Sequence, residues 1–328
     1  MGGIRDINFR PERDIPTLTD KVILVTGGED AKSYPSHDCS QKLMAIKGTA
    51  GLGSNAVKVL AKHNPSHIYF TGRNENAASA LIESIKKDIP SAGLTFLPLD
   101  LSSLSSITAG IKMFKHDRLD IFMGNAGIMA VPAALSKDGY EIQFATNHLG
   151  NAAVLYHLLP IMLKTAELPS SDVRIVLNTS LGWKFRPSQG IVFDKLKTTQ
   201  EDLPFGTWSR YGQSKVANIL YAAELARRYP QITSVAIHPG VINTGLVSNL
   251  SFWHKWFVYV TSVSQTITVE QGIMNQTWAA AGAKKKELTN GAYYMPVGVE
   301  SNSTLDTTAK DPNLAKQLWE WTERALEN

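Results

Sequence analysis

Short apolar runs alternate with longer amphipathic segments along most of this chain. Each apolar run has the length of a β-strand and is bounded by polar residues or glycine. The pattern predicts strands at residues 21–26, 67–71, 94–99, 120–124, 174–178 and 233–238, and a late one within 290–298. Apolar positions recur with the helical period at residues 51–63, 74–89, 103–114, 140–163 and 211–229, and a C-terminal helix is predicted at 314–326.

Strands that alternate with helices of this length predict an α/β fold. We expect a Rossmann-type, doubly wound, mostly parallel seven-stranded sheet with helices on both faces. In such a sheet ligands bind at the carboxyl ends of the strands. The sequence contains no internal repeat or linker, so residues 19–328 are predicted to form a single domain after an extended N-terminal arm at 1–18.

A glycine-rich loop follows the first predicted strand, but it is interrupted. The strand ends at Gly27, and the next helix begins after Gly51, Leu52 and Gly53. If residues 29–48 are left out, the join reads VTGGTAGLGSNAV, which is a strand, a glycine turn and a helix. Glycines allow close backbone approach, and a helix N-terminus offers amides and a positive dipole to a pyrophosphate. The joined sequence therefore predicts a dinucleotide site.

Residues 29–48 themselves are polar, mixed and without a period, and two interpretations stay open. The segment can be translated intron or a gene-model error, since it is in frame and the flanking glycines allow more than one join. It can also be a genuine surface loop, because loop closure costs little entropy when the ends already lie close. As a loop it would emerge at the predicted pyrophosphate site and weaken cofactor binding.

The run YGQSK places Tyr211 and Lys215 four residues apart at the start of a predicted helix. That spacing puts both side chains on one helix face. A cation beside a phenol favours the phenolate and is expected to lower the phenol's pKa from ~10. Such a tyrosine can protonate a carbonyl oxygen or deprotonate an alcohol.

With these motifs, about residues 15–325 resemble the short-chain dehydrogenase/reductase family, and in particular its retinol-dehydrogenase-like and fungal members. The resemblance implies that Tyr211 is the proton donor or acceptor and that Lys215 tunes it and binds the nicotinamide ribose. It implies that Ser180, after the fifth strand, orients the substrate oxygen, and that Asn147 holds a water of the proton relay. The expected catalytic residues are Asn147, Ser180, Tyr211 and Lys215.

The resemblance also implies a nicotinamide dinucleotide as cofactor. Gly72 occupies the position that is usually acidic in NAD-preferring relatives, and Arg73 follows it, which favours NADP(H) because a guanidinium pairs with a 2′-phosphate. Asp100 is matched to the adenine contact, Asn125 to a cofactor-binding asparagine, and Val241 and Thr244 to contacts with the nicotinamide carboxamide. The expected cofactor-binding residues are Gly27, Gly51, Leu52, Gly53, Arg73, Asp100, Asn125, Tyr211, Lys215, Val241 and Thr244.

Two segments are candidates for binding the substrate. Residues 183–208 form an excursion before the tyrosine helix that is expected to shape the substrate mouth. Residues of about 246–270 are rich in aromatics and match the family's substrate lid, which suits an apolar or aromatic carbonyl or alcohol. Peripheral packing, or loose association with a membrane surface, is the alternative for this segment.

Composition narrows the function further. The 328 residues carry a net charge of +4, with 43% hydrophobic and 19% charged residues, as in a soluble globular protein without a nucleic-acid patch. A single cysteine, Cys39, excludes an internal disulfide and favours a reducing, cytoplasmic location. No apolar stretch reaches the ~18 residues of a membrane span. No cysteine or histidine cluster has metal-ligand spacing, so no metal is expected.

The sequence therefore predicts an NADP(H)-dependent oxidoreductase that interconverts a ketone or aldehyde and an alcohol by hydride transfer. The alternative is a catalytically impaired nucleotide-binding protein with a regulatory or interaction role. The interrupted glycine loop favours that alternative, and the complete set of Asn147, Ser180, Tyr211 and Lys215 opposes it.

Overall fold

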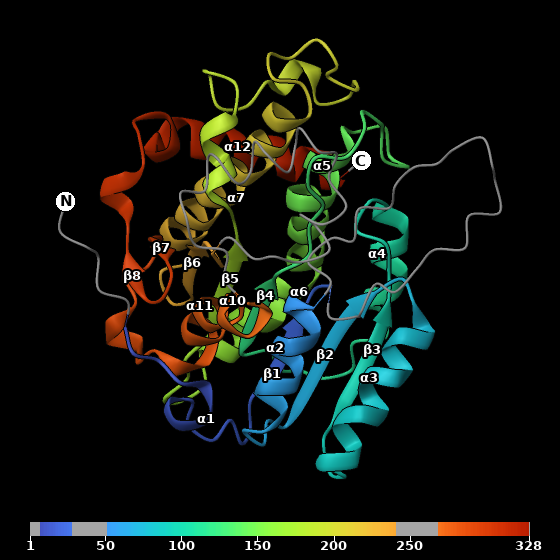
Figure 1. Ribbon diagram of the computed structural model, residues 1–328, viewed down its shortest axis with the longest axis vertical. Helices are drawn as coiled ribbons and strands as arrows, with labels where there is room; N and C mark the ends of the chain where they lie inside the picture. The colour runs from blue at the N-terminus through green and yellow to red at the C-terminus, as the bar shows by residue number, and fades with distance from the viewer. Residues whose placement is uncertain (1–6, 28–50, 241–267, 328) are drawn as a thin grey trace.

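The computed structural model describes residues 7–27, 51–240 and 268–327, and its strands and helices alternate as the sequence predicts (Figure 1). The strands are β1 (Val22–Val25), β2 (His67–Gly72), β3 (Leu94–Pro98), β4 (Ile121–Gly124), β5 (Arg174–Asn178), β6 (Thr233–Ile237), β7 (Tyr293–Met295) and β8 (Val299–Glu300). The α-helices are α1 (Pro11–Asp14), α2 (Leu52–Ala61), α3 (Glu75–Asp88), α4 (Leu104–Ile111), α5 (Ile142–Phe144), α6 (Gly150–Ala166), α7 (Thr207–Arg228), α10 (Val269–Gly272), α11 (Met274–Thr277) and α12 (Pro312–Glu327).

The strands form one sheet in the order β3-β2-β1-β4-β5-β6-β7-β8. Strands β1 to β7 run parallel, which confirms the doubly wound Rossmann-type fold class. The predicted count of seven strands is too low by one in the described part of the chain, because β8 pairs antiparallel with β7. With only two residues, β8 is too short to show an alternating pattern. The strand order reverses between β1 and β4, where ligands bind in such sheets.

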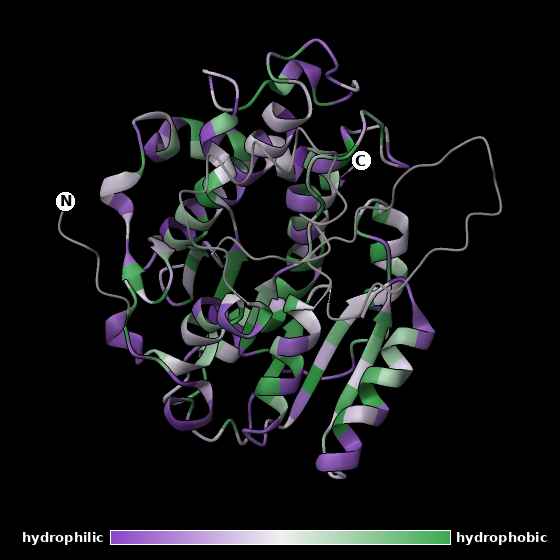
Figure 2. Ribbon diagram, in the orientation of Figure 1, coloured by the Kyte–Doolittle hydropathy of each residue, from purple (hydrophilic) through white to green (hydrophobic). Residues whose placement is uncertain are grey.

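Both faces of the sheet are covered, and each face has its own core. Along β1, Ile23 and Val25 pack with α2, α3 and the segment Trp278–Gly282, whereas Val22 and Leu24 pack on the side of α4, α6, α7 and α12. Figure 2 shows hydrophobic residues concentrated along the central strands and mixed positions along the helices. Burial on both sides explains why the strands read as continuous apolar runs.

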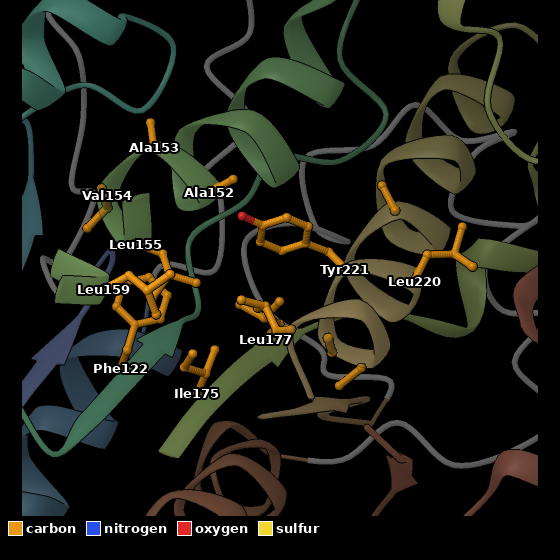
Figure 3. Packing of buried hydrophobic residues seen from close by; sticks show 14 of the residues in the cluster. Phe122, Ala152, Ala153, Val154, Leu155, Leu159, Ile175, Leu177, Leu220 and Tyr221 are labelled. Atoms are coloured by element: carbon orange, nitrogen blue, oxygen red, sulfur yellow. The ribbon is translucent and has the colours of Figure 1, made fainter. Parts of the chain in front are cut away.

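The larger core joins the centre of the sheet to the helices that carry the candidate site. Figure 3 shows Phe122 of β4 and Leu177 of β5 in one buried cluster that also includes Leu155 of α6 and Leu220 of α7. These side chains are almost completely buried. Each contributes about 1.5–3 kcal/mol relative to an exposed position, so α6 and α7 are held firmly on the sheet.

The N-terminal arm differs from the expected extended segment within residues 7–18. Pro11–Asp14 form α1, with proline at the first helical turn where its missing N–H is not needed. Phe9, Ile15 and Leu18 are buried in the core beneath α2. This segment is thus part of the folded body, because its apolar side chains find a place beside α2 and the sheet.

The long helix predicted at 140–163 is present but not uniform. Glu141 caps it by accepting a 2.7 Å hydrogen bond from the Phe144 amide. After α5, the residues Ala145–Leu149 form a π-helix, and α6 then continues to Ala166. A π-turn inserts an extra residue into the helical ladder and often marks a functional site. Asn147 lies within this turn.

The C-terminal helix α12 packs as predicted. Leu314 and Leu318 are buried, and Trp319 stacks on Tyr221 of α7 at 5.2 Å between ring centroids. His148 in the π-helix shares a 3.0 Å hydrogen bond with the Thr322 hydroxyl of α12. Burial lowers the pKa of His148 to about 3, so this packed histidine is neutral at physiological pH. Among the described residues, no helix combines the length and the apolar character that crossing a membrane requires.

Candidate active site

The two halves of the interrupted glycine loop meet in space. A Cβ atom added to Gly53 would lie only 2.1 Å from the Gly27 carbonyl oxygen, so these two residues are in direct contact. Gly27 has φ +66°, and a Cβ there would lie 2.8 Å from the Ala126 side chain. Larger residues cannot be placed at either position without moving the backbone. The strand end and the helix start are therefore assembled as the joined sequence predicts, and residues 29–48 lie outside the described part of the chain.

The N-terminus of α2 has the character of an anion site. Its N-cap is Gly51 at φ +106°, which has no side chain to accept from the amides of the first turn. The helix continues for 10 residues to Ala61, so those amides carry a full helix dipole. Gly51 leaves room for a pyrophosphate against these amides, because a Cβ there would meet nothing closer than Val269 at 3.5 Å, whereas Gly27 and Gly53 let the strand end and the helix start pack closely. The residues present therefore fit a dinucleotide.

A chain of buried amides ties this loop to the centre of the sheet. Asn125, after β4, donates to the Thr26 carbonyl at 3.0 Å and accepts from Asn178 at 2.9 Å. The Asn178 amide also donates to Gln276, which donates to the Leu52 carbonyl at 3.2 Å. The sequence interpretation singled out Asn125 but missed Asn178 and Gln276. A polar residue closing the buried run RIVLN was the available signal for Asn178.

Tyr211 and Lys215 share one face of α7, as their spacing predicts. They are 7% and 5% exposed, and the Lys215 Nζ lies 5.6 Å from the centroid of the Tyr211 ring. A Cβ at Gly182 would lie 2.6 Å from a ring carbon of Tyr211 and 3.5 Å from the Ser180 Oγ. Gly182 thus lets the strand end carrying Ser180 approach the phenol closely.

Asn147 joins the same group from the other side. A Cβ at Gly127 would lie 2.9 Å from the Asn147 Oδ1 and 3.2 Å from the Lys215 Nζ. The Asn147 side chain accepts from the Ile128 amide at 2.6 Å and donates to the Ser214 hydroxyl at 2.9 Å. The four residues predicted as catalytic therefore converge at the carboxyl ends of β4 and β5.

The ionisation of Tyr211 and Lys215 differs from the sequence expectation. Burial raises the pKa of Tyr211 to about 12, and the neighbouring Ser180 hydroxyl opposes this rise only in part. Burial also lowers the pKa of Lys215 to about 8. The expectation that Lys215 would lower the pKa of the phenol is corrected, because the same apolar surroundings disfavour both the phenolate and the ammonium. Tyr211 therefore holds its proton at neutral pH.

The buried lysine should make stability depend on pH. In the unfolded chain Lys215 has an ordinary lysine pKa of ~10.4, so between its two pKa values the unfolded state binds more protons and the free energy of unfolding rises with pH. Comparing the chain with Lys215→Met by urea unfolding, we expect the native lysine to add about 2 kcal/mol of stability from pH 7 to pH 10. If the free energy of unfolding changed equally with pH in the two proteins, the burial of the Lys215 amine would be contradicted.

Two further predicted cofactor residues, Arg73 and Asp100, lie along the same edge of the sheet. Arg73 is exposed directly after β2, and Asp100 follows β3. The Asp100 carboxylate accepts from the Ser102 amide at 2.9 Å, while Ser103 caps α4, so Asp100 does not serve as the helix cap. Val241 and Thr244 lie outside the described residues, as does most of the predicted lid.

An apolar wall flanks the Tyr211 ring. Trp208 meets it edge-on at 6.3 Å between ring centroids, and Phe185 packs on Trp208. Met129 and Ala130, from the loop after β4, complete this cluster. Both aromatic side chains thus come from the predicted excursion at 183–208. Its other elements are the short helices Leu181–Phe185, which begins just before it, and Phe193–Lys195.

Comparisons with known proteins identify the family. A family model described as short chain dehydrogenase matches residues 42–181. The short-chain dehydrogenase/reductase drtF of Aspergillus calidoustus is 33% identical over 326 residues, covering 95% of this chain and 95% of that protein. An uncharacterized oxidoreductase of Schizosaccharomyces pombe is 34% identical over 323 residues, covering 96% of this chain and 87% of that protein.

The fold is also shared with solved structures. A gluconate 5-dehydrogenase from Burkholderia cenocepacia, in complex with NADP and tartrate, matches with a TM-score of 0.61 at 18% identity, covering 87% of this chain and 96% of that one. At this identity the match concerns the fold alone. The two curated relatives, in contrast, extend over nearly the whole length at more than 30% identity. The chain belongs to the short-chain dehydrogenase/reductase family of oxidoreductases.

Proposed function

We propose that this protein is an NADP(H)-dependent oxidoreductase that interconverts a ketone or aldehyde and the corresponding alcohol. The observation that supports this most is the convergence of Tyr211, Lys215, Ser180 and Asn147 beside the bare backbone of the glycine loop. NADPH, held by the glycine loop and the N-terminus of α2, supplies the hydride when bound. The single cysteine supports a reducing, cytoplasmic location as part of the proposal.

Tyr211 is the proposed proton donor in reduction. Its raised pKa keeps the phenol protonated, and the proton is released when negative charge develops on the substrate oxygen. The Ser180 hydroxyl, close to the same ring, orients that oxygen and stabilises the developing charge. In the oxidative direction the step runs in reverse, and it is the phenolate form of Tyr211 that accepts the alcohol proton.

Lys215 and Asn147 support the tyrosine. The Lys215 Nζ donates to the Asn178 carbonyl at 3.4 Å and so stays anchored at the end of β5 beside the phenol. Asn147 fixes Gly127 and Ile128 against α7 through its bonds to Ile128 and Ser214. Because its side chain is already bonded on both sides, we assign Asn147 this fixing role, and the water of the proton relay stays a prediction.

The preference for NADP(H) rests on the pair Gly72 and Arg73. Gly72 stands where an acidic residue would repel a 2′-phosphate, and Arg73, which follows it, is exposed.

Replacing the positive charge of Arg73 with a negative charge should shift the coenzyme preference from NADPH towards NADH. We expect Arg73→Asp to raise the Kd for NADPH at least about tenfold, since each charge-assisted bond contributes on the order of 1.5–3 kcal/mol, and to leave NADH binding equal or tighter. The variant Arg73→Ala removes the attraction for the 2′-phosphate without adding repulsion. Its Kd for NADPH should therefore lie between those of the native chain and Arg73→Asp. Fluorescence titrations with both coenzymes measure the ratio. If the ratio of the Kd values for NADPH and NADH is unchanged in both variants, Arg73 does not bind the 2′-phosphate.

The substrate is proposed to be an apolar or aromatic carbonyl compound. The wall of Trp208, Phe185 and Met129 beside Tyr211 offers apolar surface to the group next to the reacting carbon. Steady-state oxidation of NADPH with a panel of aliphatic, aromatic and charged carbonyl compounds tests both parts of the proposal. Turnover with aromatic members is expected, whereas turnover of charged sugars alone would contradict the assigned substrate class.

The alternative of an impaired nucleotide-binding protein is less well supported. It was suggested by the interruption at residues 29–48, yet Gly27 and Gly53 are in contact across it. The proton-transfer residues are all present and gathered, which a protein without chemistry does not need.

A further inference from the structure

A buried ion pair lies between the helix of Asn147 and the helix of Tyr211. Glu141 is 0% exposed at the start of α5, and Arg210 is 4% exposed in α7. The Arg210 Nε lies 3.4 Å from the Glu141 Oε1, and neither atom makes a hydrogen bond within the described part of the chain. Arg210 therefore helps to compensate the Glu141 carboxylate, together with the backbone amides of Phe144 and Gln143.

The other polar atoms of this pair bind three separate segments. The Arg210 guanidinium donates to the Gln200 carbonyl at 3.3 Å and to the Val131 carbonyl at 3.5 Å. The Glu141 carboxylate accepts from the Phe144 amide at 2.7 Å. One pair thus connects the excursion before α7, the loop after β4 and the helix that leads into the π-turn.

Gln143, on the same helical turn, extends the connection. Its side chain accepts from the Ala130 amide at 2.9 Å and donates to the Thr207 carbonyl at 3.0 Å. The Thr207 hydroxyl in turn donates to the Val131 carbonyl at 2.7 Å. Ala130 has φ +53°, a conformation that residues other than glycine rarely adopt, so these bonds hold a loop that would otherwise relax.

Stability alone does not account for an ion pair at this place. A buried pair is often no more stabilising than well-packed apolar side chains of the same volume, because both charges lose their hydration. What apolar side chains cannot supply is a directed connection to three carbonyl or amide groups. Arg210 directly precedes Tyr211, and the loop that it holds presents Met129 and Ala130 to the Tyr211 ring.

We infer that Glu141 and Arg210 are positioning residues that set the first turn of α7 against the π-helix and the 128–131 loop, and thereby place Tyr211 for proton transfer. The inference rests on the proposed function. Neither residue acts on the substrate itself; both act through the backbone that carries Tyr211, Met129 and Asn147.

The test is the paired variant Glu141→Gln with Arg210→Met, which removes both charges without leaving one unpaired. We expect a melting temperature and an NADPH Kd close to those of the native chain, and a kcat for 4-nitrobenzaldehyde reduced at least about tenfold, as for loss of orientation of a general acid. Deuterium exchange at the 128–131 amides should accelerate at least about tenfold, because the hydrogen bond from the Ala130 amide to the Gln143 side chain is loosened.

The matched control is Glu224→Gln with Arg228→Met, which removes an ion pair at the other end of α7. This control should leave kcat and exchange at residues 128–131 unchanged. If the Glu141–Arg210 double variant fails to fold, Arg210→Lys replaces it, because it keeps the charge but loses the two-carbonyl contact, and a threefold or larger drop in kcat is expected.

A folded double variant with native kcat, or Arg210→Lys with native kcat, overturns the inference and leaves the proposed function intact. If the native chain shows no turnover with any carbonyl compound, the proposed function fails. The rate of deuterium exchange at residues 128–131 then tests the positioning role by itself. Faster exchange confined to residues 128–131 then still supports the positioning role, and unchanged exchange overturns it.

Discussion

Replacing Tyr211 with phenylalanine is expected to lower kcat at least about 100-fold while the NADPH Kd stays within about threefold, because a positioned general acid contributes 10²–10⁴-fold. The substitution removes only the hydroxyl and keeps the ring that packs against Trp208. Carbonyl-dependent oxidation of NADPH gives kcat, and fluorescence titration gives the Kd.

Tyr221→Phe is the matched control for this prediction. Tyr221 lies on the same helix, is 3% exposed and packs against Trp319 and His148 in the core. Its substitution should leave kcat nearly unchanged. Native turnover in Tyr211→Phe would remove the phenol from the mechanism, and an equal loss in both variants would indicate a general effect on α7.

The second large effect concerns residues 29–48. Deleting them is expected to tighten NADPH binding at least about tenfold, because they are inserted in the sequence between the strand and the helix at whose N-terminus we propose that the pyrophosphate binds. Gly27 and Gly53 already touch, so a short join requires no rearrangement of β1 or α2. Shortening the loop also lowers the entropy cost of closing it, although only slightly.

Fluorescence titration of both proteins measures this effect. A variant in which residues 29–48 are replaced by glycine and serine repeats of the same length separates the role of length from that of sequence. Equal or tighter binding by the complete chain would show that the segment is compatible with the site. Sequencing the mature transcript gives an independent answer, since a message that keeps these codons rules out a translated intron.

Much of the fold could be read from the sequence because its signals are local. Strands buried on both faces are apolar runs, as residues 174–178 show, and β5 has those bounds. The helical period alone puts Tyr211 and Lys215 on one face. The glycines at 27 and 53 were recognisable because only bare backbone fits a strand-to-helix turn around a pyrophosphate.

Other features depend on contacts between distant residues. The hydrogen bond from Asn178 to Gln276 joins residues 98 positions apart, and no local sequence pattern predicts it. Burial is the main cause that raises the pKa of Tyr211, so reasoning from the neighbouring Lys215 alone gave the wrong direction. Likewise, the π-turn at Asn147 has the same apolar period as the helix around it.

Transfer of a deuteride from labelled NADPH to 4-nitrobenzaldehyde tests the central claim most directly. The native chain or its variant without residues 29–48 should yield alcohol with one deuterium on the carbinol carbon, detected by mass spectrometry, and Tyr211→Phe should yield little. If both proteins bind NADPH but no carbonyl compound in the panel acquires deuterium, the claim that Tyr211, Ser180 and Lys215 form an oxidoreductase site is contradicted.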